Sequence, residues 1–229
     1  MNKLYIAGDS FATLSITQEN GVSWSEILAT KLGLELVNVA IAGCSNFSIA
    51  IQLDWITQQA TKDDAVIIML TDHYRKTLVN STDAKIDSTP LLLHHLFHRK
   101  QRVQIELSDI ILKATTIINA DSNERDFYKK WFHPVVQEFE DTLVIIGALT
   151  KLSSVTNNYI VCLGGFGNQV YDANDTISHK TFFIKESNFL KLSSKQLSNM
   201  AENDIAINHM DELLHKKVAG VLYKKYLKL

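Results

Sequence analysis

The chain has 229 residues, of which 46% are hydrophobic and 21% charged, which is enough apolar material for one substantial core. Its 23 basic residues nearly balance its 25 acidic ones, so there is no general electrostatic field for binding nucleic acid. No apolar run is long enough for a membrane-spanning helix or for the core of a signal peptide after Met1. We therefore expect a soluble protein without an N-terminal signal peptide, cytoplasmic by default, with neither nucleic acid nor membrane as a partner.

Strands and helices alternate in the first third of the sequence. Continuous apolar runs predict strands at residues 3–7, 36–40 and 65–70. Apolar residues at helical spacing predict helices at 24–32 and 47–60. Continuous apolar strands that alternate with helices are typical of a parallel sheet covered on both faces. The predicted fold class is α/β, a three-layer α/β/α sandwich with a parallel, flavodoxin-like sheet.

The pattern changes after the third predicted strand. Helical spacing predicts helices at about 104–119 and 124–153, and Pro134 should begin a new segment or kink the second one. A polar stretch precedes them. We interpret residues 74–122 as a helical insertion after the third strand.

The last part of the chain returns to the first pattern. A strand is predicted at 159–163 and a final amphipathic helix at 211–227, which completes a single domain over residues 1–229. In an open parallel sheet, ligands bind outside the carboxyl ends of the strands. Candidate site residues should therefore follow the predicted strands directly.

Metal and cofactor sites are not indicated. Cys44 and Cys162 are too few for a disulfide framework or a zinc site, and we interpret both as buried thiols near strand ends. His94, His95 and His98 include the i, i+4 spacing of a metal-binding helix face. Their leucine, phenylalanine, arginine and lysine neighbours favour an amphipathic surface or lid helix instead, so no metal and no cofactor is predicted.

Chemistry is suggested by a serine at the end of the first strand. Gly8-Asp9-Ser10 follows the strand at 3–7, and the turn would present Ser10 at the carboxyl edge of the sheet. A serine attacks an ester only with a base within hydrogen-bond reach and donors for the oxyanion. His209, just before the last predicted helix, is the candidate base.

These motifs together resemble the GDSL, or SGNH, hydrolase family of serine esterases and lipases. Gly8-Asp9-Ser10 matches its first motif, Ile41-Ala42-Gly43-Cys44-Ser45-Asn46 resembles the second, and His209 resembles the histidine of the last. The resemblance implies that Ser10 is the nucleophile and His209 the general base. It also implies that the backbone amides of Ser10 and Gly43 bind the oxyanion.

The first departure from the family concerns the residue that orients the histidine. The family usually has an aspartate three residues before the histidine, where this chain has Ala206. Asp204 is the nearest substitute and would complete a Ser10, His209, Asp204 triad. A Ser-His dyad oriented by a backbone carbonyl is the alternative.

The second departure lies after the third strand, where the family carries an asparagine that donates to the oxyanion. Asp72 stands there, and an ionised carboxylate cannot donate. Asn46 is an alternative amide and Thr71 an alternative hydroxyl, while Arg75 would pair with Asp72 or hold an anionic substrate group. The sequence does not choose among them. We expect Asp9, Thr71 and Arg75 to line the substrate site.

The predicted function is hydrolysis of carboxylic esters through an acyl-enzyme. A small acyl ester or an O-acetylated carbohydrate is favoured as the substrate over a long-chain lipid, since no dedicated hydrophobic lid is evident. The alternative is a catalytically inactive binding or assembly protein of the same fold. An unrelated doubly wound protein that binds a nucleotide at the strand edge ranks last.

Overall fold

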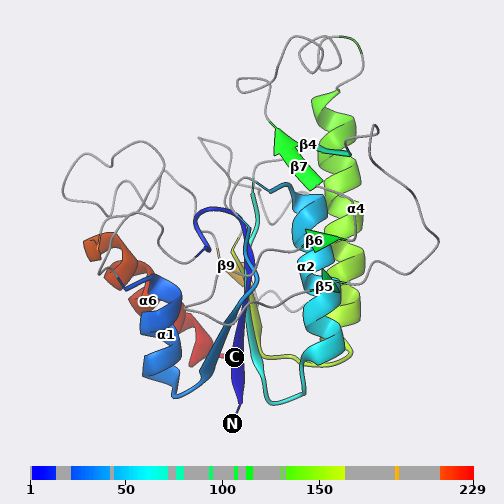
Figure 1. Ribbon diagram of the computed structural model, residues 1–229. Coiled ribbons are helices and arrows are strands. Elements are labelled where there is room, and N and C mark those ends of the chain that lie inside the picture. Colours follow the sequence, from blue (N-terminus) through cyan, green and yellow to red (C-terminus); the bar gives the residue numbers. More distant parts are fainter. Residues whose placement is uncertain are drawn as a thin grey trace.

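A parallel sheet lies between two layers of helices. The computed structural model describes residues 2–13, 22–41, 44–71, 133–162 and 212–229, with Lys130 and a few short strands besides. Helices α1 (Trp24–Leu32) and α6 (Glu212–Tyr226) cover one face of the sheet, and α2 (Asn46–Gln59) and α4 (Pro134–Ser153) cover the other (Figure 1). The predicted three-layer α/β/α architecture is confirmed.

The central sheet has five strands, all parallel to their neighbours. Its order is β2-β1-β3-β8-β9. The strands are β1 (Lys3–Gly8), β2 (Glu35–Asn38), β3 (Ala65–Met69), β8 (Tyr159–Cys162) and β9 (Phe189–Leu190). The chain reverses its direction of travel across the sheet after β2, which is the flavodoxin-like order. In sheets of this order ligands bind outside the carboxyl ends of the strands where the direction reverses, here β1 and β3.

Successive residues of β1 pack into two different cores. Tyr5 and Ala7 belong to the cluster under α2 and α4, whereas Leu4 and Ile6 belong to the cluster under α1 and α6. All four are at most 1% exposed. Burial on both faces is the reason why the strand is apolar throughout rather than alternating.

The helices begin and end where their local chemistry dictates. Ser23 and Glu26 form a capping box at the start of α1, and Gly33 ends this helix in the left-handed conformation, with a φ of 67°. Pro134 is the first residue of α4, a position that needs no backbone N–H donor. The expectation that Pro134 begins a new segment is confirmed.

The described residues of the insertion are strands, which corrects the helix predicted at 104–119. Strand β4 (Lys76–Val79) pairs with β7 (Leu112–Thr115), and β5 (Leu93–His94) pairs with β6 (Glu106–Leu107), both antiparallel. Strand β5 also falls within the predicted lid helix. Partners distant in sequence stabilise such strands, and this overrides the weak local preference for a helix. The remainder of 74–122 lies outside the described residues.

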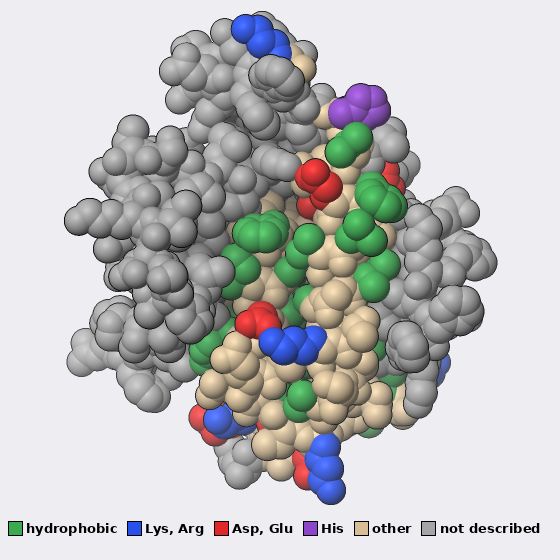
Figure 2. Space-filling model, turned by 90° about the vertical axis from the view of Figure 1, so that its right-hand side faces the viewer, with side chains coloured by type: hydrophobic (Ala, Val, Ile, Leu, Met, Phe, Trp, Pro, Cys, Tyr) green, Lys and Arg blue, Asp and Glu red, His purple; other side chains and the backbone are tan. Residues whose placement is uncertain are grey.

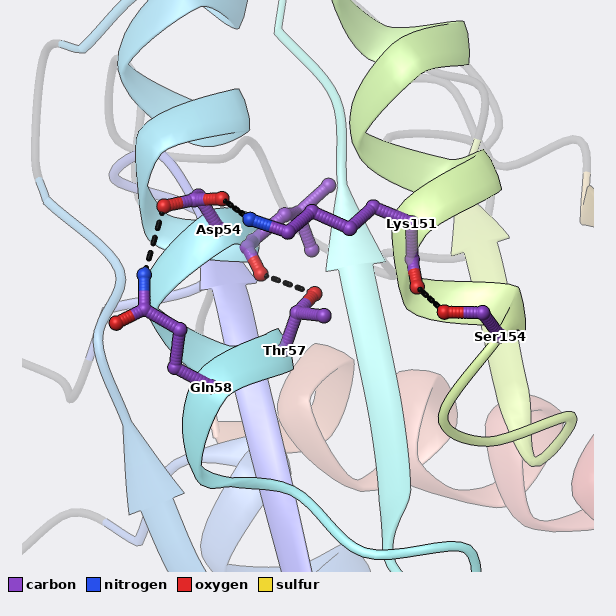
Figure 3. A network of polar contacts seen from close by, with 6 residues as sticks. Asp54, Thr57, Gln58, Lys151 and Ser154 are labelled. Carbon is purple, nitrogen blue, oxygen red and sulfur yellow. Dashed lines mark hydrogen bonds and ion pairs between the residues drawn. The ribbon is translucent and has the colours of Figure 1, made fainter.

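The outer surface of α2 and α4 carries both charged and apolar side chains (Figure 2). Asp54 of α2 pairs with Lys151 of α4, and its other oxygen accepts a hydrogen bond from Gln58 at 2.8 Å (Figure 3). Such an exposed pair adds little to stability. Val136 and Leu143 of α4 are each 53% exposed.

Both cysteines are buried thiols, as predicted. Burial raises the pKa of the Cys162 thiol to about 12, which keeps it protonated at neutral pH. Within the described part of the chain, no helix has the length and apolarity to cross a bilayer.

Asp64 connects the beginnings of β1 and β3 and supplies a test of the fold. Its Oδ1 accepts from the backbone N–H of Lys3 at 2.6 Å, and its Oδ2 accepts from the N–H and the hydroxyl of Thr61 at 2.8 and 2.9 Å. Burial by itself raises the pKa of Asp64, but these hydrogen bonds outweigh burial and the pKa is lowered. The carboxylate therefore stabilises the fold above the unfolded pKa, and this contribution is lost as the pH falls through the folded pKa.

We expect Asp64→Asn to lower the free energy of unfolding at pH 7 by about 1.5–3 kcal/mol, because one acceptor becomes a donor that faces an N–H. Denaturant titrations from pH 7 down to pH 2 measure the difference from wild type, which should shrink below about pH 4. Asp63→Asn, at an exposed neighbouring carboxylate, is the matched control. A difference that stays constant with pH would contradict this assignment.

Candidate active site

Ser10 lies in a tight turn at the carboxyl end of β1. The N–H groups of Ala12 and Thr13 donate to the Asp9 carbonyl at 2.9 and 3.1 Å, and the Thr13 hydroxyl donates to the Ser10 carbonyl at 3.0 Å. Ser10 is partly exposed, and none of the described residues bonds to its hydroxyl or its backbone N–H. A nucleophilic serine uses its hydroxyl to attack and its N–H to bind the oxyanion. Neither group of Ser10 is bonded to any of the described residues.

Gly8 anchors this turn to α2. The Gln52 side chain forms a two-point contact, in which Oε1 accepts from the Gly8 N–H at 2.8 Å and Nε2 donates to the Gly8 carbonyl at 3.2 Å. The same carbonyl accepts from the Ile41 N–H at 3.0 Å and the Cys44 thiol at 3.3 Å. Gly8, Gln52 and Cys44 are buried and Ile41 is partly buried, so the end of β1 is held firmly in place.

No side chain fits at Gly8. A Cβ atom would lie 2.7 Å from Ala12 Cβ and 2.9 Å from the Met69 carbonyl oxygen, and the φ of 156° is one that other residues rarely adopt. The glycine of the Gly8-Asp9-Ser10 motif is thus needed for the close approach of the turn to β3.

Two further side chains fix the turn from the other layer. Trp24 at the start of α1 donates its indole N–H to the Phe11 carbonyl at 2.8 Å, and Asn38 at the end of β2 donates to the Ala12 carbonyl at 2.7 Å. The sequence analysis missed Trp24, Asn38 and Gln52. The available signal was a polar residue at the end of an apolar strand for Asn38, and a polar residue among buried helix positions for Gln52.

Asp9 directs its carboxylate into the protein. It is 2% exposed; Oδ1 accepts from the Phe11 N–H at 3.0 Å, and Oδ2 accepts from the Thr71 hydroxyl at 2.7 Å. Thr71, just beyond the end of β3, is fully buried. The sequence placed Asp9 and Thr71 in the substrate site, whereas their described hydrogen bonds are internal to the protein.

Asn46 is also occupied by internal bonds. Its Oδ1 accepts from the Thr71 N–H at 3.0 Å, and its Nδ2 donates to the Thr71 carbonyl at 2.9 Å and to Asp141 Oδ2 at 3.0 Å. Asn46 is 1% exposed. Both amide hydrogens are therefore in use, which leaves none for an oxyanion in this arrangement.

The closing helix α6 is tied to the same turn through Trp24. His215 Nδ1 accepts from the Trp24 backbone N–H at 3.1 Å, which satisfies a free donor at the start of α1. Leu214 packs in one cluster with Trp24 and Ala12. The interpretation of His215 as a packing or capping residue is confirmed.

The remaining predicted site residues lie outside the described residues. They are Gly43, Asp72, Arg75, Asp204 and His209. Within the described part of the chain, no group of three or more His, Cys, Asp or Glu side chains is placed to hold a metal ion.

No family model and no curated protein matches the sequence. Several solved structures are similar to the chain, among them the following three. One is a protein from Desulfitobacterium hafniense described as lipolytic and of the G-D-S-L family; it is 14% identical, with a TM-score of 0.45, and the similarity covers 98% of this chain and 99% of that one. Another is a carbohydrate esterase family 2 enzyme with a carbohydrate-binding domain from Corynascus thermopiles (Myceliophthora fergusii), 12% identical with a TM-score of 0.45, covering 99% of this chain and 66% of that one.

The third is protein YXIM from Bacillus subtilis, which is 14% identical with a TM-score of 0.37; the similarity covers 75% of this chain and only 34% of that one. At these identities and TM-scores the similarity is one of fold, and the fold assignment itself rests on the strand order.

The crowding at Gly8 gives a test of the site. We expect Gly8→Ala to destabilise the protein by about 3 kcal/mol or more. The new methyl group would overlap the backbone of Met69, and alanine would have to adopt a φ that is strained for it. Gly147→Ala in α4 is the matched control, since its Cβ would meet nothing within 4 Å. It should stabilise the protein by about 0.5–1 kcal/mol, as alanine does in a helix interior. Thermal unfolding of both variants measures the two effects, and equal stability of Gly8→Ala and wild type would refute the geometry.

Proposed function

We propose that the chain is a serine-dependent hydrolase of carboxylic esters, with Ser10 as the nucleophile. The observation that carries the proposal is the Ser10 turn, which lies at the carboxyl end of β1 on a buried anchor and in which the Ser10 hydroxyl and N–H have no hydrogen-bond partner among the described residues. Preorganised donors and a fixed nucleophile are what acyl transfer requires, because geometry lost before the reaction raises its barrier.

His209 is the proposed general base, and the described part of α6 supports it. This helix begins at Glu212, three residues after His209. Three residues of chain span at most about 11 Å. His215 is bonded to Trp24, whose indole is bonded to the Phe11 carbonyl beside Ser10. The start of α6 is thus held close to the Ser10 turn. The chain between His209 and Glu212 is short, which supports His209 as the base for Ser10.

In the proposed reaction Ser10 Oγ attacks the ester carbonyl while His209 Nε2 takes its proton. The imidazolium then protonates the leaving alcohol, and the acyl-enzyme remains. Water next attacks the acyl carbonyl while His209 takes a proton from it, and His209 returns this proton to Ser10 Oγ as the acid is released. The amides of Ser10 and Gly43 would stabilise the oxyanion. Asp204 would orient the imidazole, with a dyad as the alternative.

The remaining polar residues divide into two groups in this proposal. Asp9, Thr71 and Asn46 position the loops through the internal bonds described above. Asp72 and Arg75 are assigned to the substrate by sequence position alone, Asp72 at the place of the family's oxyanion asparagine and Arg75 as its partner or as a site for an anionic group. We propose a small acyl ester or an O-acetylated carbohydrate as the substrate class.

Hydrolysis of p-nitrophenyl acetate and labelling by a fluorophosphonate test the catalytic residues. Ser10→Ala should abolish labelling, and Ser10→Ala and His209→Ala should each lower kcat by about a thousandfold or more. Asp204→Asn should lower kcat by at least about tenfold if it completes the triad, and by less than about threefold if a dyad operates. Ser154→Ala, at an exposed serine of α4's C-cap, is the control and should behave as wild type. Equal rates in Ser10→Ala, His209→Ala and wild type, all folded, would remove the proposed site.

A second candidate function is a catalytically inactive binding or assembly protein of the same fold. Two observations favour it: Asp72 stands in the sequence where the family carries its oxyanion asparagine, and both hydrogens of the alternative amide, Asn46, are used in internal bonds. The two candidates differ in what they expect of one substitution.

Asp72→Asn should raise kcat/KM for p-nitrophenyl acetate by at least about tenfold in an esterase, because the amide adds a donor where the carboxylate repels developing negative charge. Asp63→Asn, which removes the same charge from an exposed position, should change nothing. If neither wild type nor Asp72→Asn hydrolyses the ester or reacts with the fluorophosphonate, the binding protein is favoured. A fall in kcat/KM would mean that Asp72 takes part in catalysis as a carboxyl group.

A further inference from the structure

A chain of buried polar side chains runs from α4 to the residue before Ser10. Gln137 donates to Asp141 Oδ1 at 2.7 Å, and Asn46 donates to Asp141 Oδ2 at 3.0 Å. Asn46 pairs with the backbone of Thr71, and the Thr71 hydroxyl donates to Asp9. Each of the five side chains is at most 6% exposed. We call this set, Gln137, Asp141, Asn46, Thr71 and Asp9, the buried polar chain.

The buried polar chain is expensive unless it is complete. A buried carboxylate is tolerated only when donors surround it, and a buried amide without a partner costs about 1–3 kcal/mol. Apolar residues at positions 46 and 141 would pack α2 against α4 equally well. Leu53 of α2 and Leu149 of α4 do this in the apolar cluster between these helices and the sheet. The cost is therefore evidence that these polar groups do something that packing alone would not.

What they do follows from where the chain ends. Asn46 holds both the N–H and the carbonyl of Thr71, so it fixes the backbone that leads directly to Asp72. Thr71 in turn fixes Asp9, whose own backbone carbonyl accepts the two N–H bonds that close the Ser10 turn. Asp141 adds a third bond that holds the Asn46 amide in the orientation matched to Thr71, because a flipped amide would present Nδ2 to the Thr71 N–H and Oδ1 to the Asp141 carboxylate.

We propose that Asp141 of α4 is a positioning residue for the Ser10 site, acting through Asn46 and Thr71 on the two loops that follow β1 and β3. The inference rests on the proposed esterase function for its kinetic consequence, but the structural coupling can be measured without it. Asp141 aligns the loops and takes no part in proton transfer or in binding the substrate. Its loss should lower kcat while leaving KM nearly unchanged.

The test compares Asp141→Ala with Thr142→Val, each in the full chain. Asp141→Ala removes the acceptor of two buried amides, whereas Thr142→Val removes a buried hydroxyl that bonds only to the Glu138 carbonyl of its own helix. For p-nitrophenyl acetate, Asp141→Ala should lower kcat by about tenfold or more with KM within about threefold. The rate of fluorophosphonate labelling should fall by the same factor, while Thr142→Val leaves both unchanged.

Amide hydrogen exchange supplies a readout that does not need activity. In Asp141→Ala the amides of Phe11, Ala12, Thr13 and Thr71 should exchange at least about tenfold faster than in wild type, whereas Thr142→Val should change them little. Asp141→Asn keeps an oxygen that accepts from Asn46 Nδ2. The Gln137 amide can turn so that its oxygen accepts from the new NH2 group at position 141. It should restore kcat and exchange to within about threefold of wild type.

The outcomes separate the two proposals. Unchanged exchange in the Ser10 turn of Asp141→Ala would overturn the positioning role whatever the activity of wild type. If wild type is active, a kcat of Asp141→Ala no lower than that of Thr142→Val would overturn it as well. An inactive wild type with faster exchange in Asp141→Ala would support the coupling and refute the esterase. If Asp141→Ala does not fold, Thr71→Val, which breaks the next link by removing one hydroxyl, should show the same selective loss of kcat and of protection at Phe11; normal values for both would overturn the proposal.

Discussion

The arrangement depends on the contact between the end of β1 and its neighbours at Gly8. There the strand comes so close to β3 and to the following turn that a methyl group would overlap the Met69 carbonyl and Ala12. The Gln52 amide adds to the pairing with β3, since it binds both the N–H and the carbonyl of Gly8. Because Gly8 is so constrained, the turn that follows it is restricted to one conformation, and this conformation fixes the position of Ser10.

Polar contacts reach this turn from both helical layers. On one side Trp24 and Asn38 hold its carbonyls, and His215 joins Trp24 to the closing helix. On the other side Asp9 is linked through Thr71 to α2 and α4. Apolar packing determines which face each helix covers, but it is not directional. The buried hydrogen bonds add direction at the one edge of the sheet where a reaction would need it.

Much of the fold could be predicted because its determinants are local. The helix at Trp24–Leu32, the start of α4 at Pro134 and the strands buried on both faces follow from spacing, capping and continuous apolar runs. The insertion could not be predicted in this way, because Lys76–Val79 pairs with Leu112–Thr115, a contact that no short window contains. The order of the core strands was within reach once the alternation of strands and helices was recognised.

The site was predictable in place but not in detail. Strand ends located Ser10, Asp9, Asn46 and Thr71 at one edge, but whether a polar side chain faces the crevice or the interior depends on neighbours from other elements. Gln52 illustrates the difficulty, because only the folded structure shows which backbone its amide meets. The roles of His209, Asp204, Gly43, Asp72 and Arg75 stay predictions.

The two buried thiols, Cys44 and Cys162, can report on how the native protein opens. Burial raises the pKa of the Cys162 thiol to about 12, so the thiol is protonated at pH 7 and an alkylating reagent meets almost no reactive sulfur until β8 separates from the sheet. Cys44 lies instead beside Gly8, where its sulfur touches the anchor of the Ser10 turn. The modification rates of the two sulfurs, followed by mass spectrometry in a single sample, therefore distinguish a local breathing motion around the serine from opening of the entire core.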